Sequence, residues 1–201
     1  AQAVPFPGVL GRVCYHPCEG QCNRLEVDKP VAVRALKRFV ADYAAAHGGL
    51  HWERAELDPA LPPVAVIGAG PAGLTVAWGL ARAGVRVTVF EALPVAGGML
   101  AVGIPAYRLP REVLRREIAA IEALGVEVRL NAPLGPDLTL DDLFAQGYGA
   151  IFLGLGAHRS RRLDVPGEDL PGVVHAIDLL RMVCLAPEKS TREELRAYLR
   201  E

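Results

Sequence analysis

A glycine-rich turn is the part of this sequence best suited to chemistry. It consists, in order, of Gly68, Ala69, Gly70, Pro71, Ala72 and Gly73. In such a turn the first glycine permits a tight bend, the second lets the backbone approach a pyrophosphate, and the third allows close packing of a helix against a strand. The first amides of the following helix present positive charge to the phosphates. The spacing therefore predicts a dinucleotide-binding loop.

An acidic residue supports this interpretation. Glu91 falls at the end of the next predicted strand, where a carboxylate can accept both hydroxyls of an adenosine ribose. The same charge would repel a 2′-phosphate, which disfavours NADP at this loop. The alternative is a structural glycine turn that binds nothing, and the strand, helix and acid in register argue against it. The loop by itself does not separate FAD from NAD.

Three of the four cysteines form a tight group. Cys14, Cys18 and Cys22 offer soft thiolate ligands of the kind that iron–sulfur clusters or zinc prefer. Both centres need four ligands, and His16 or Glu19 could complete a site, although neither spacing is diagnostic. The fourth cysteine, Cys184, stands in an apolar stretch and is predicted to be a packed core thiol.

The elements that position these residues alternate between strand and helix. Runs of apolar or β-branched residues predict the strands, and apolar residues at helical spacing predict the helices. Thr139 with Asp142 forms a capping-box pattern. The predicted elements are, in order, a strand at 64–67, a helix at 71–83, a strand at 85–90, a helix at 110–124, a strand at 126–130, a short helix at 139–146 and a strand at 150–153. This order indicates an α/β fold with a parallel sheet and helices on its faces.

The two ends of the chain differ from this centre. Residues 1–29 are irregular, a helix is expected to begin at Pro30 and to stop at Gly48, and a proline-rich linker spans 58–63. Two further helices are expected at 175–183 and 191–200. We therefore divide the chain into residues 1–60, residues 61–185 and a C-terminal helix at 186–201.

The overall composition is that of an ordinary globular protein. Hydrophobic residues make up 51% of the chain and the net charge is −1, which gives no electrostatic reason to expect a nucleic acid or an anionic membrane as partner. No stretch is apolar enough to cross a bilayer. The N-terminus shows no secretion signal and no initiator Met, so we expect a cytoplasmic chain that is processed or partial. No Ser–His–Asp or Cys–His arrangement suggests hydrolysis.

Several motifs together resemble one known family. They are GRVCYHPCEGQCNR at 11–24, the glycine loop at 68–73, GGML at 97–100, GIPAYRLP at 103–110 and PGED at 166–169. In this order they resemble the NADPH-dependent glutamate synthase small (beta) subunit family, whose module recurs in dihydropyrimidine dehydrogenase. The similarity covers roughly residues 6–183. It implies a Rossmann-like FAD-binding domain preceded by a small helical iron–sulfur-type domain, with electrons passing from NADPH to FAD and then through [4Fe-4S] clusters to a partner.

The resemblance also implies roles for individual residues. Residues 68–72 would face the FAD pyrophosphate, Glu91 would hold the ribose, and Arg108 would contact FAD. The remaining positions are Gly98 and Met99 along the ribityl–flavin portion, Leu134 near the adenine, and Gly154 with Gly156 at the carboxyl edge of the sheet. A cation such as Arg108 at a helix start is disfavoured by the helix dipole unless an anion lies nearby, which also favours a functional arginine.

The chain departs from the family pattern at its ligands. In relatives such as dihydropyrimidine dehydrogenase, the cysteines matching Cys14 and Cys18 serve one cluster, the one matching Cys22 serves another, and further ligands lie upstream. This chain has no cysteine before Cys14, has Lys37 where relatives place Gln or Glu, and has no second glycine fingerprint. It also lacks the returning segment that completes the FAD domain in the family, so residues 61–185 are expected to form an incomplete FAD-binding domain without the NADPH domain. We therefore expect partner redox subunits to supply the missing cluster ligands, the NAD(P)H site or the acceptor.

The sequence thus predicts a flavin-dependent electron-transfer oxidoreductase unit that is not self-sufficient for NADPH oxidation. Its metal ligands would be Cys14, Cys18 and Cys22, and its cofactors FAD and a [4Fe-4S] cluster with an incomplete ligand set. His158 is expected at the surface or beside the pyrophosphate. The alternative is a non-catalytic binding or assembly module that keeps the fold but lacks a complete cluster and an NADPH site.

Overall fold

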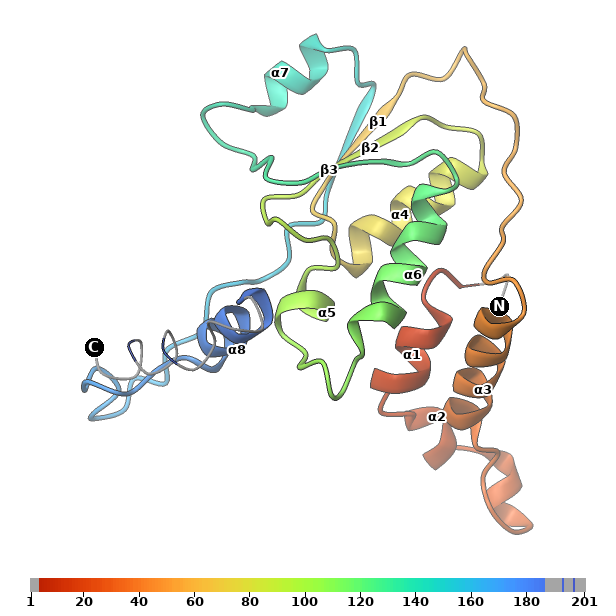
Figure 1. The fold of residues 1–201 in the computed structure, drawn as a ribbon, viewed down its shortest axis with the longest axis vertical. Helices are drawn as coiled ribbons and strands as arrows, with labels where there is room; N and C mark the ends of the chain where they lie inside the picture. Colours follow the sequence, from red (N-terminus) through yellow and green to blue (C-terminus); the bar gives the residue numbers. More distant parts are fainter. Residues whose placement is uncertain (1–3, 187–192, 194–196, 198–201) are drawn as a thin grey trace.

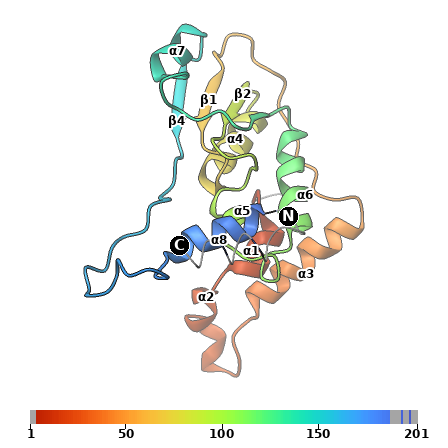
Figure 2. The same cartoon turned by 60° about the vertical axis from the view of Figure 1, so that its left-hand side comes forward.

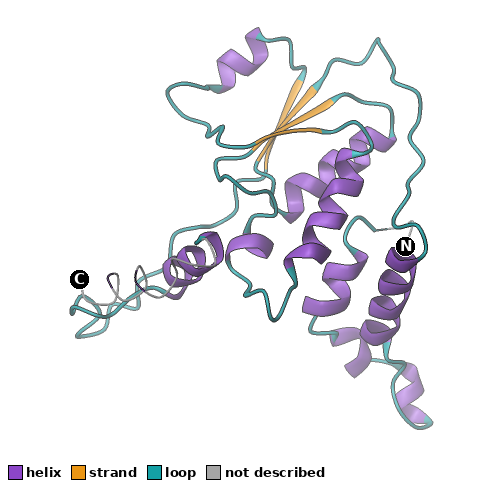
Figure 3. Cartoon of the chain, in the orientation of Figure 1, coloured by secondary structure: helices purple, strands orange, loops and turns teal. Residues whose placement is uncertain are grey.

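The computed structural model describes residues 4–186, 193 and 197, and its elements follow the order shown in Figures 1 and 3. The N-terminal part contains α1 (Pro7–Val13), α2 (Pro17–Gly20), the 3-10 helix η1 (Asn23–Glu26) and α3 (Val33–Ala46). The remaining elements are β1 (Val64–Ile67), α4 (Pro71–Arg82), β2 (Val87–Phe90), α5 (Met99–Val102), α6 (Arg111–Glu122), β3 (Glu127–Arg129), α7 (Leu140–Ala145), β4 (Ala150–Leu153) and α8 (Ala176–Leu185).

The four strands form one parallel sheet in the order β3-β2-β1-β4. Val66 in β1 lies opposite Val89 in β2 and Phe152 in β4. The chain runs outward from β1 through β2 to β3 and then returns to the other side of β1. This order is that of a Rossmann-like fold, in which ligands bind beyond the carboxyl ends of the strands where the winding direction reverses. The α/β prediction is confirmed.

Side chains alternate between the two faces of the sheet, as the two-residue repeat of a strand requires. One face packs against α4 and α6 and the other against α7, which lie on opposite sides of the sheet in Figure 1. The α7 face contains Ala65, Ile67, Phe90, Leu143 and Tyr148. The larger cluster on the opposite face includes Val66, Leu74, Val89, Ile118 and Ile121.

The N-terminal helices share this larger core. Phe6, Val9 and Trp52 are buried in the same cluster as the α4 and α6 side chains. The buried carboxylate of Glu117, on α6, accepts hydrogen bonds from the backbone N–H of Gly8 at 2.6 Å and of Val9 at 3.1 Å. An acidic side chain thereby satisfies amides at the start of α1. Burial raises the pKa of Glu117, and the two amides oppose that rise.

Two helix starts differ from the sequence prediction. Neither Pro30 nor Pro110 is the first helical residue, because α3 begins at Val33 and α6 at Arg111. In α3 the reason is a tertiary contact, since the carboxylate of Glu19 accepts a hydrogen bond from the backbone N–H of Arg34 at 2.9 Å. That contact caps the helix from outside its own sequence. The predicted capping box of Thr139 and Asp142 is present at α7.

The C-terminal part of the described chain lies beside the dinucleotide-binding half. Helix α8 packs next to α5, as both Figure 1 and Figure 2 show. The predicted helix at 191–200 falls outside the described residues except for Glu193 and Ala197. No helix among residues 4–186 is both long and apolar enough to span a membrane.

Candidate dinucleotide-binding site

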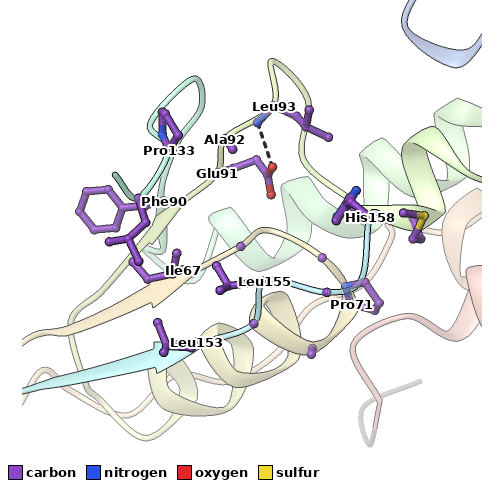
Figure 4. Close-up of a pocket in the computed structure, with 18 of the residues that line it drawn as sticks. Ile67, Pro71, Phe90, Glu91, Ala92, Leu93, Pro133, Leu153, Leu155 and His158 are labelled. Carbon is purple, nitrogen blue, oxygen red and sulfur yellow. Dashed lines mark hydrogen bonds between the residues drawn. The ribbon is translucent and has the colours of Figure 1, made fainter. Parts of the chain in front are cut away.

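A cavity of about 730 Å³ opens at the carboxyl ends of β1, β2 and β4. Most of the residues that the sequence assigned to a cofactor line it, and Figure 4 shows it between Glu91 on one side and the segment from Leu153 to His158 on the other. The predicted residues among its lining are Gly68, Gly70, Pro71, Ala72, Glu91, Gly98, Met99, Leu134, Gly154 and Gly156. The structure therefore gathers predicted residues as far apart in the chain as Gly68 and Gly156.

The three glycines of the loop have different surroundings. A Cβ on Gly68, whose φ is +103°, would collide with the carbonyl oxygen of Gly154, and a Cβ on Gly73 would collide with the carbonyl oxygen of Gly68. Both glycines therefore serve the fold. A Cβ on Gly70 would meet nothing closer than the Cα of Gly98 at 3.9 Å. The backbone of Gly70 is therefore open to the cavity, where a phosphate could contact it directly.

The start of α4 leaves its amides available. Gly70 is the N-cap residue and provides no side-chain hydrogen bond to the first turn. The first N–H groups of a helix have no partner within the helix and carry the positive end of its dipole. Facing the cavity, they form an anion-binding position of the kind that dinucleotide folds use for a pyrophosphate.

Glu91 has a structural contact that the sequence did not predict. Its side chain is buried, Oε2 accepts from the N–H of Ala69 at 2.7 Å, and Oε1 accepts from the N–H of Leu93 at 2.9 Å; the second bond is the dashed line in Figure 4. Glu91 thereby holds the glycine loop against the end of β2. Each carboxylate oxygen can accept more than one hydrogen bond, so capacity for a ribose diol remains.

Arg181 is a lining residue that sequence reasoning missed. It lies on α8, and its Nη2 donates to Nδ1 of His158 at 3.0 Å, which assigns the ring proton to Nε2. Its Nε is buried and has no hydrogen-bond partner among the described residues. Both side chains line the cavity, so the position predicted for His158 beside a pyrophosphate is compatible with the fold. No local pattern could have revealed Arg181, because its place depends on how α8 packs against α5.

Arg108 does not line this cavity. It lies in a second, separate cavity with three arginines of the N-terminal helices. The physical reason is the path of the chain, since residues 103–110 leave α5 and run toward α1 before α6 begins. The dipole at the start of α6 acts on Arg111 instead, which donates to the carbonyl oxygens of Leu100 and Ile104 at 2.9 and 2.8 Å. The geometry gives no support to a contact between Arg108 and FAD.

The cysteines of the N-terminal region are not gathered into a metal centre. All three are free, Cys18 is exposed, and Cys14 and Cys22 are half-buried. Within the described part of the chain, no three His, Cys, Asp or Glu side chains are close enough to hold a metal ion. The two candidate fourth ligands contact each other, with His16 Nδ1 3.2 Å from Glu19 Oε2. The described residues therefore do not fit a complete [4Fe-4S] cluster.

The remaining thiols have distinct environments. Backbone hydrogen bonds, from Val31 first and then from Arg24, lower the pKa of the Cys22 thiol. Cys184 is half-buried, and its Sγ lies 3.0 Å from Nη2 of Arg111. The prediction of a packed core thiol is therefore wrong for Cys184, because α8 lies at the edge of the fold and its cysteine faces a guanidinium.

Two segments of the chain match known protein families. Residues 66–114 match a family described as an NAD(P)-binding Rossmann-like domain, and residues 1–49 match dihydropyrimidine dehydrogenase domain II, 4Fe-4S cluster. Among solved structures, FprA of Mycobacterium tuberculosis in complex with NADPH is similar in fold, with a TM-score of 0.57 and 24% identity over 63% of this chain and 30% of that chain. The molecule thus combines a Rossmann-like dinucleotide-binding fold with an N-terminal region of iron–sulfur-domain type.

Longer proteins of known name are similar to most of this chain. The beta subunit of the NADP(+)-dependent formate dehydrogenase of Moorella thermoacetica is 50% identical over 204 residues, covering 89% of this chain and 29% of the relative. The glutamate synthase [NADPH] small chain of Halomonas elongata is 39% identical over 179 residues, covering 87% and 37%. The chain is homologous to the glutamate synthase small-chain family and related NADPH oxidoreductase beta subunits, as its motifs indicated. It spans about a third of the length of these relatives.

Proposed function

We propose that this chain binds FAD in the cavity at the carboxyl edge of the sheet and forms the flavin-holding part of an electron-transfer oxidoreductase. One observation carries the proposal. The bare backbone at Gly70, the uncapped start of α4 and the carboxylate of Glu91 converge on one cavity of about 730 Å³. A pyrophosphate and a ribose need these groups at this place in a Rossmann-like fold.

Different residues would bind different parts of the cofactor. The backbone around Gly70 and the first turn of α4 would neutralise the pyrophosphate, and Arg181 adds a cation with an unused buried Nε. Glu91 would accept the ribose hydroxyls while bracing Ala69, and its charge disfavours the 2′-phosphate of NADP. The isoalloxazine supplies the redox chemistry when bound, and the protein contributes binding and orientation. We choose FAD rather than NAD because the family that the sequence motifs resemble is expected to hold FAD at this loop.

For the cysteine region we propose a shared cluster rather than a complete one. The match of residues 1–49 to a 4Fe-4S domain supports a role for the cysteine region in electron transfer. Because the described cysteines are spread apart, we infer that Cys14, Cys18 and Cys22 act together with ligands contributed from elsewhere, such as a partner redox subunit. The names of the relatives as beta subunits and small chains support such a partner.

The test is a ligand titration of the purified chain with FAD, NADH and NADPH, followed by flavin fluorescence and absorption. We expect FAD to bind most tightly and NADPH to bind weakest. Arg181→Ala should weaken FAD binding by about fivefold or more, since a charge-assisted contact is lost. Arg159→Ala removes an exposed arginine outside the cavity and is the matched control. Tighter binding of NADPH than of FAD would contradict the assignment.

A second candidate function follows from the spread cysteines. A chain that keeps this fold but assembles no redox centre would be a docking module within a larger complex. Gentle purification followed by a visible spectrum separates the two. Flavin bands that bleach on addition of dithionite support the oxidoreductase, and a colourless chain that rejects added FAD supports the module.

A further inference from the structure

A second cavity lies where the N-terminal helices meet the segment before α6. Its volume is about 330 Å³, and four arginines line it: Arg12 from α1, Arg34 and Arg38 from α3, and Arg108 from the loop that precedes α6. The arginines come from both halves of the chain. Close packing of α1 on α3 brings the first three together, since a Cβ on Gly11 would lie only 2.7 Å from the Cα of Arg38.

The charges in this cavity do not balance. Asp42 pairs with Arg12 through an Nη2–Oδ1 contact of 2.8 Å and with Arg38 through an Nε–Oδ2 contact of 3.5 Å. One carboxylate therefore serves two guanidinium groups. Arg34 donates to the carbonyl oxygen of Cys14 at 3.3 Å, which is a neutral partner. Arg108 makes no side-chain hydrogen bond or ion pair with any described residue.

Four cations around one concave space repel one another unless an anion joins them. Guanidinium groups present planar forks of N–H donors that match phosphate and carboxylate oxygens in two-point contacts. A cavity of this size admits a phosphate group together with a small part of the molecule that carries it. A flat basic surface would instead suit a macromolecule. Phosphate carries up to about two negative charges near neutral pH and has more oxygens than a carboxylate, so it fits the excess of guanidinium groups better.

We propose that this arginine cavity binds a phosphate group, either free phosphate or the phosphate of a small metabolite. The site is separate from the dinucleotide cavity, and the proposal does not depend on FAD. An anion there would contact Arg34, which holds the backbone of Cys14, and Arg108, which belongs to the Rossmann-like half. Binding therefore connects the cysteine region to the dinucleotide-binding region and stabilises the junction between them.

The experiment is a titration of the full chain with inorganic phosphate and with adenosine monophosphate, read by isothermal calorimetry and by thermal unfolding, with sodium chloride at matched ionic strength. We expect phosphate, beyond the salt effect, to raise the melting temperature. Arg34→Ala combined with Arg108→Ala should weaken phosphate binding by about tenfold or more. Arg24→Ala, which removes an exposed arginine paired with Asp28, is the matched control.

Two single variants and a second ligand separate the possible results of this experiment. The single variant Arg108→Gln changes an exposed side chain, so it tests the site even if the double variant fails to fold. Glu91→Ala should leave phosphate binding unchanged, which separates this site from the FAD site. Tighter binding of adenosine monophosphate than of phosphate, with both weakened by Arg108→Gln, identifies a phosphorylated metabolite as the ligand. No phosphate response beyond sodium chloride, or equal affinity in wild type and Arg108→Gln, overturns the proposal.

Discussion

The glycine-loop region and the cysteine region both begin as short motifs of closely spaced residues, but only the first has its predicted residues gathered around one cavity. Around Gly68–Gly73 the strand ends, the start of α4 and Glu91 meet in one cavity. Around Cys14–Cys22 the thiols stay apart among the described residues, and His16 pairs with Glu19.

The difference comes from what supports each motif. The glycine loop lies between a strand and a helix whose positions the parallel sheet determines, so its geometry follows from the fold. The cysteines lie on the short elements α2 and η1 and the connections around them, which have no buried residue between Pro17 and Glu26. A site built from backbone groups is positioned by the fold itself. A site built from thiols on exposed segments needs further ligands to bring those thiols together.

The largest expected effect is on the fold of the glycine loop itself. Gly73→Val places a side chain against the carbonyl oxygen of Gly68 in a close-packed contact, so we expect a loss of about 3 kcal/mol or more of unfolding free energy. Gly79→Ala, in the same helix with open space around its Cβ, is the control. It should stabilise the chain by about 0.5–1 kcal/mol. Denaturant unfolding measures both, and equal stability of the two variants would contradict the packing role of Gly73.

The next effect tests the junction between the two regions. Glu117→Ala leaves the amides of Gly8 and Val9 without their acceptor, so we expect a loss of about 2 kcal/mol or more of unfolding free energy, since each unsatisfied group costs at least about 1 kcal/mol. Denaturant unfolding of wild type and variant measures it. A loss confined to the N-terminal helices, with the sheet intact, would show that the two regions do not share one cooperative core.

The same residue gives a pH dependence. Because burial raises the folded pKa of Glu117, the unfolded chain releases this proton first as the pH rises. The contribution of Glu117 to stability is therefore full below about pH 4.3, the ordinary value for Glu, and is lost as the pH rises through the folded pKa. The stability of wild type relative to Glu117→Gln should fall over that range. A difference that stays flat or grows with pH would contradict this sign.

A smaller effect concerns the ligand rather than the fold. Glu91→Ala removes the ribose acceptor and the brace on Ala69, so we expect about tenfold or greater weakening of FAD binding. Fluorescence titration measures it, and Glu91→Gln, which keeps one carbonyl acceptor, should lose less. Unchanged FAD affinity in Glu91→Ala would show that Glu91 does not bind the ribose.

The smallest effect separates the thiols from one another. Because backbone hydrogen bonds lower the pKa of Cys22, its thiolate fraction near neutral pH is larger than that of an unperturbed thiol. We expect iodoacetamide to modify Cys22 several-fold faster than the exposed Cys18, as followed by mass spectrometry. Cys18→Ser should leave thermal stability unchanged and lower any iron that the chain takes up. Faster modification of Cys18 than of Cys22 would count against the environment described for the two thiols.

Local sequence was sufficient for much of the fold. The strands at 64–67 and 150–153, the helix at 71–83 and the capping box at Thr139 were predicted from periodicity and end signals. Each is a short-range feature whose physical cause lies within a few residues. The start of α3 was misplaced, because proline restricts its own φ but does not determine which amide a distant carboxylate caps. The start of α6 differs by one residue, since Pro110 is the N-cap rather than the first helical residue. Cys184 was misjudged because an apolar neighbourhood in sequence is not burial in space.

What the sequence determined by itself is the glycine turn between a strand and a helix and the class of fold, because glycine spacing and apolar repeats act through the backbone over short distances. Only the tertiary structure decided which side chains share a cavity. It brought Arg181 to the dinucleotide site, took Arg108 to the arginine cavity, and assigned the carboxylate of Glu91 to the amide of Ala69. These pairings depend on how α1, α3 and α8 pack against the sheet domain, and packing between distant segments leaves no periodic signal in the chain.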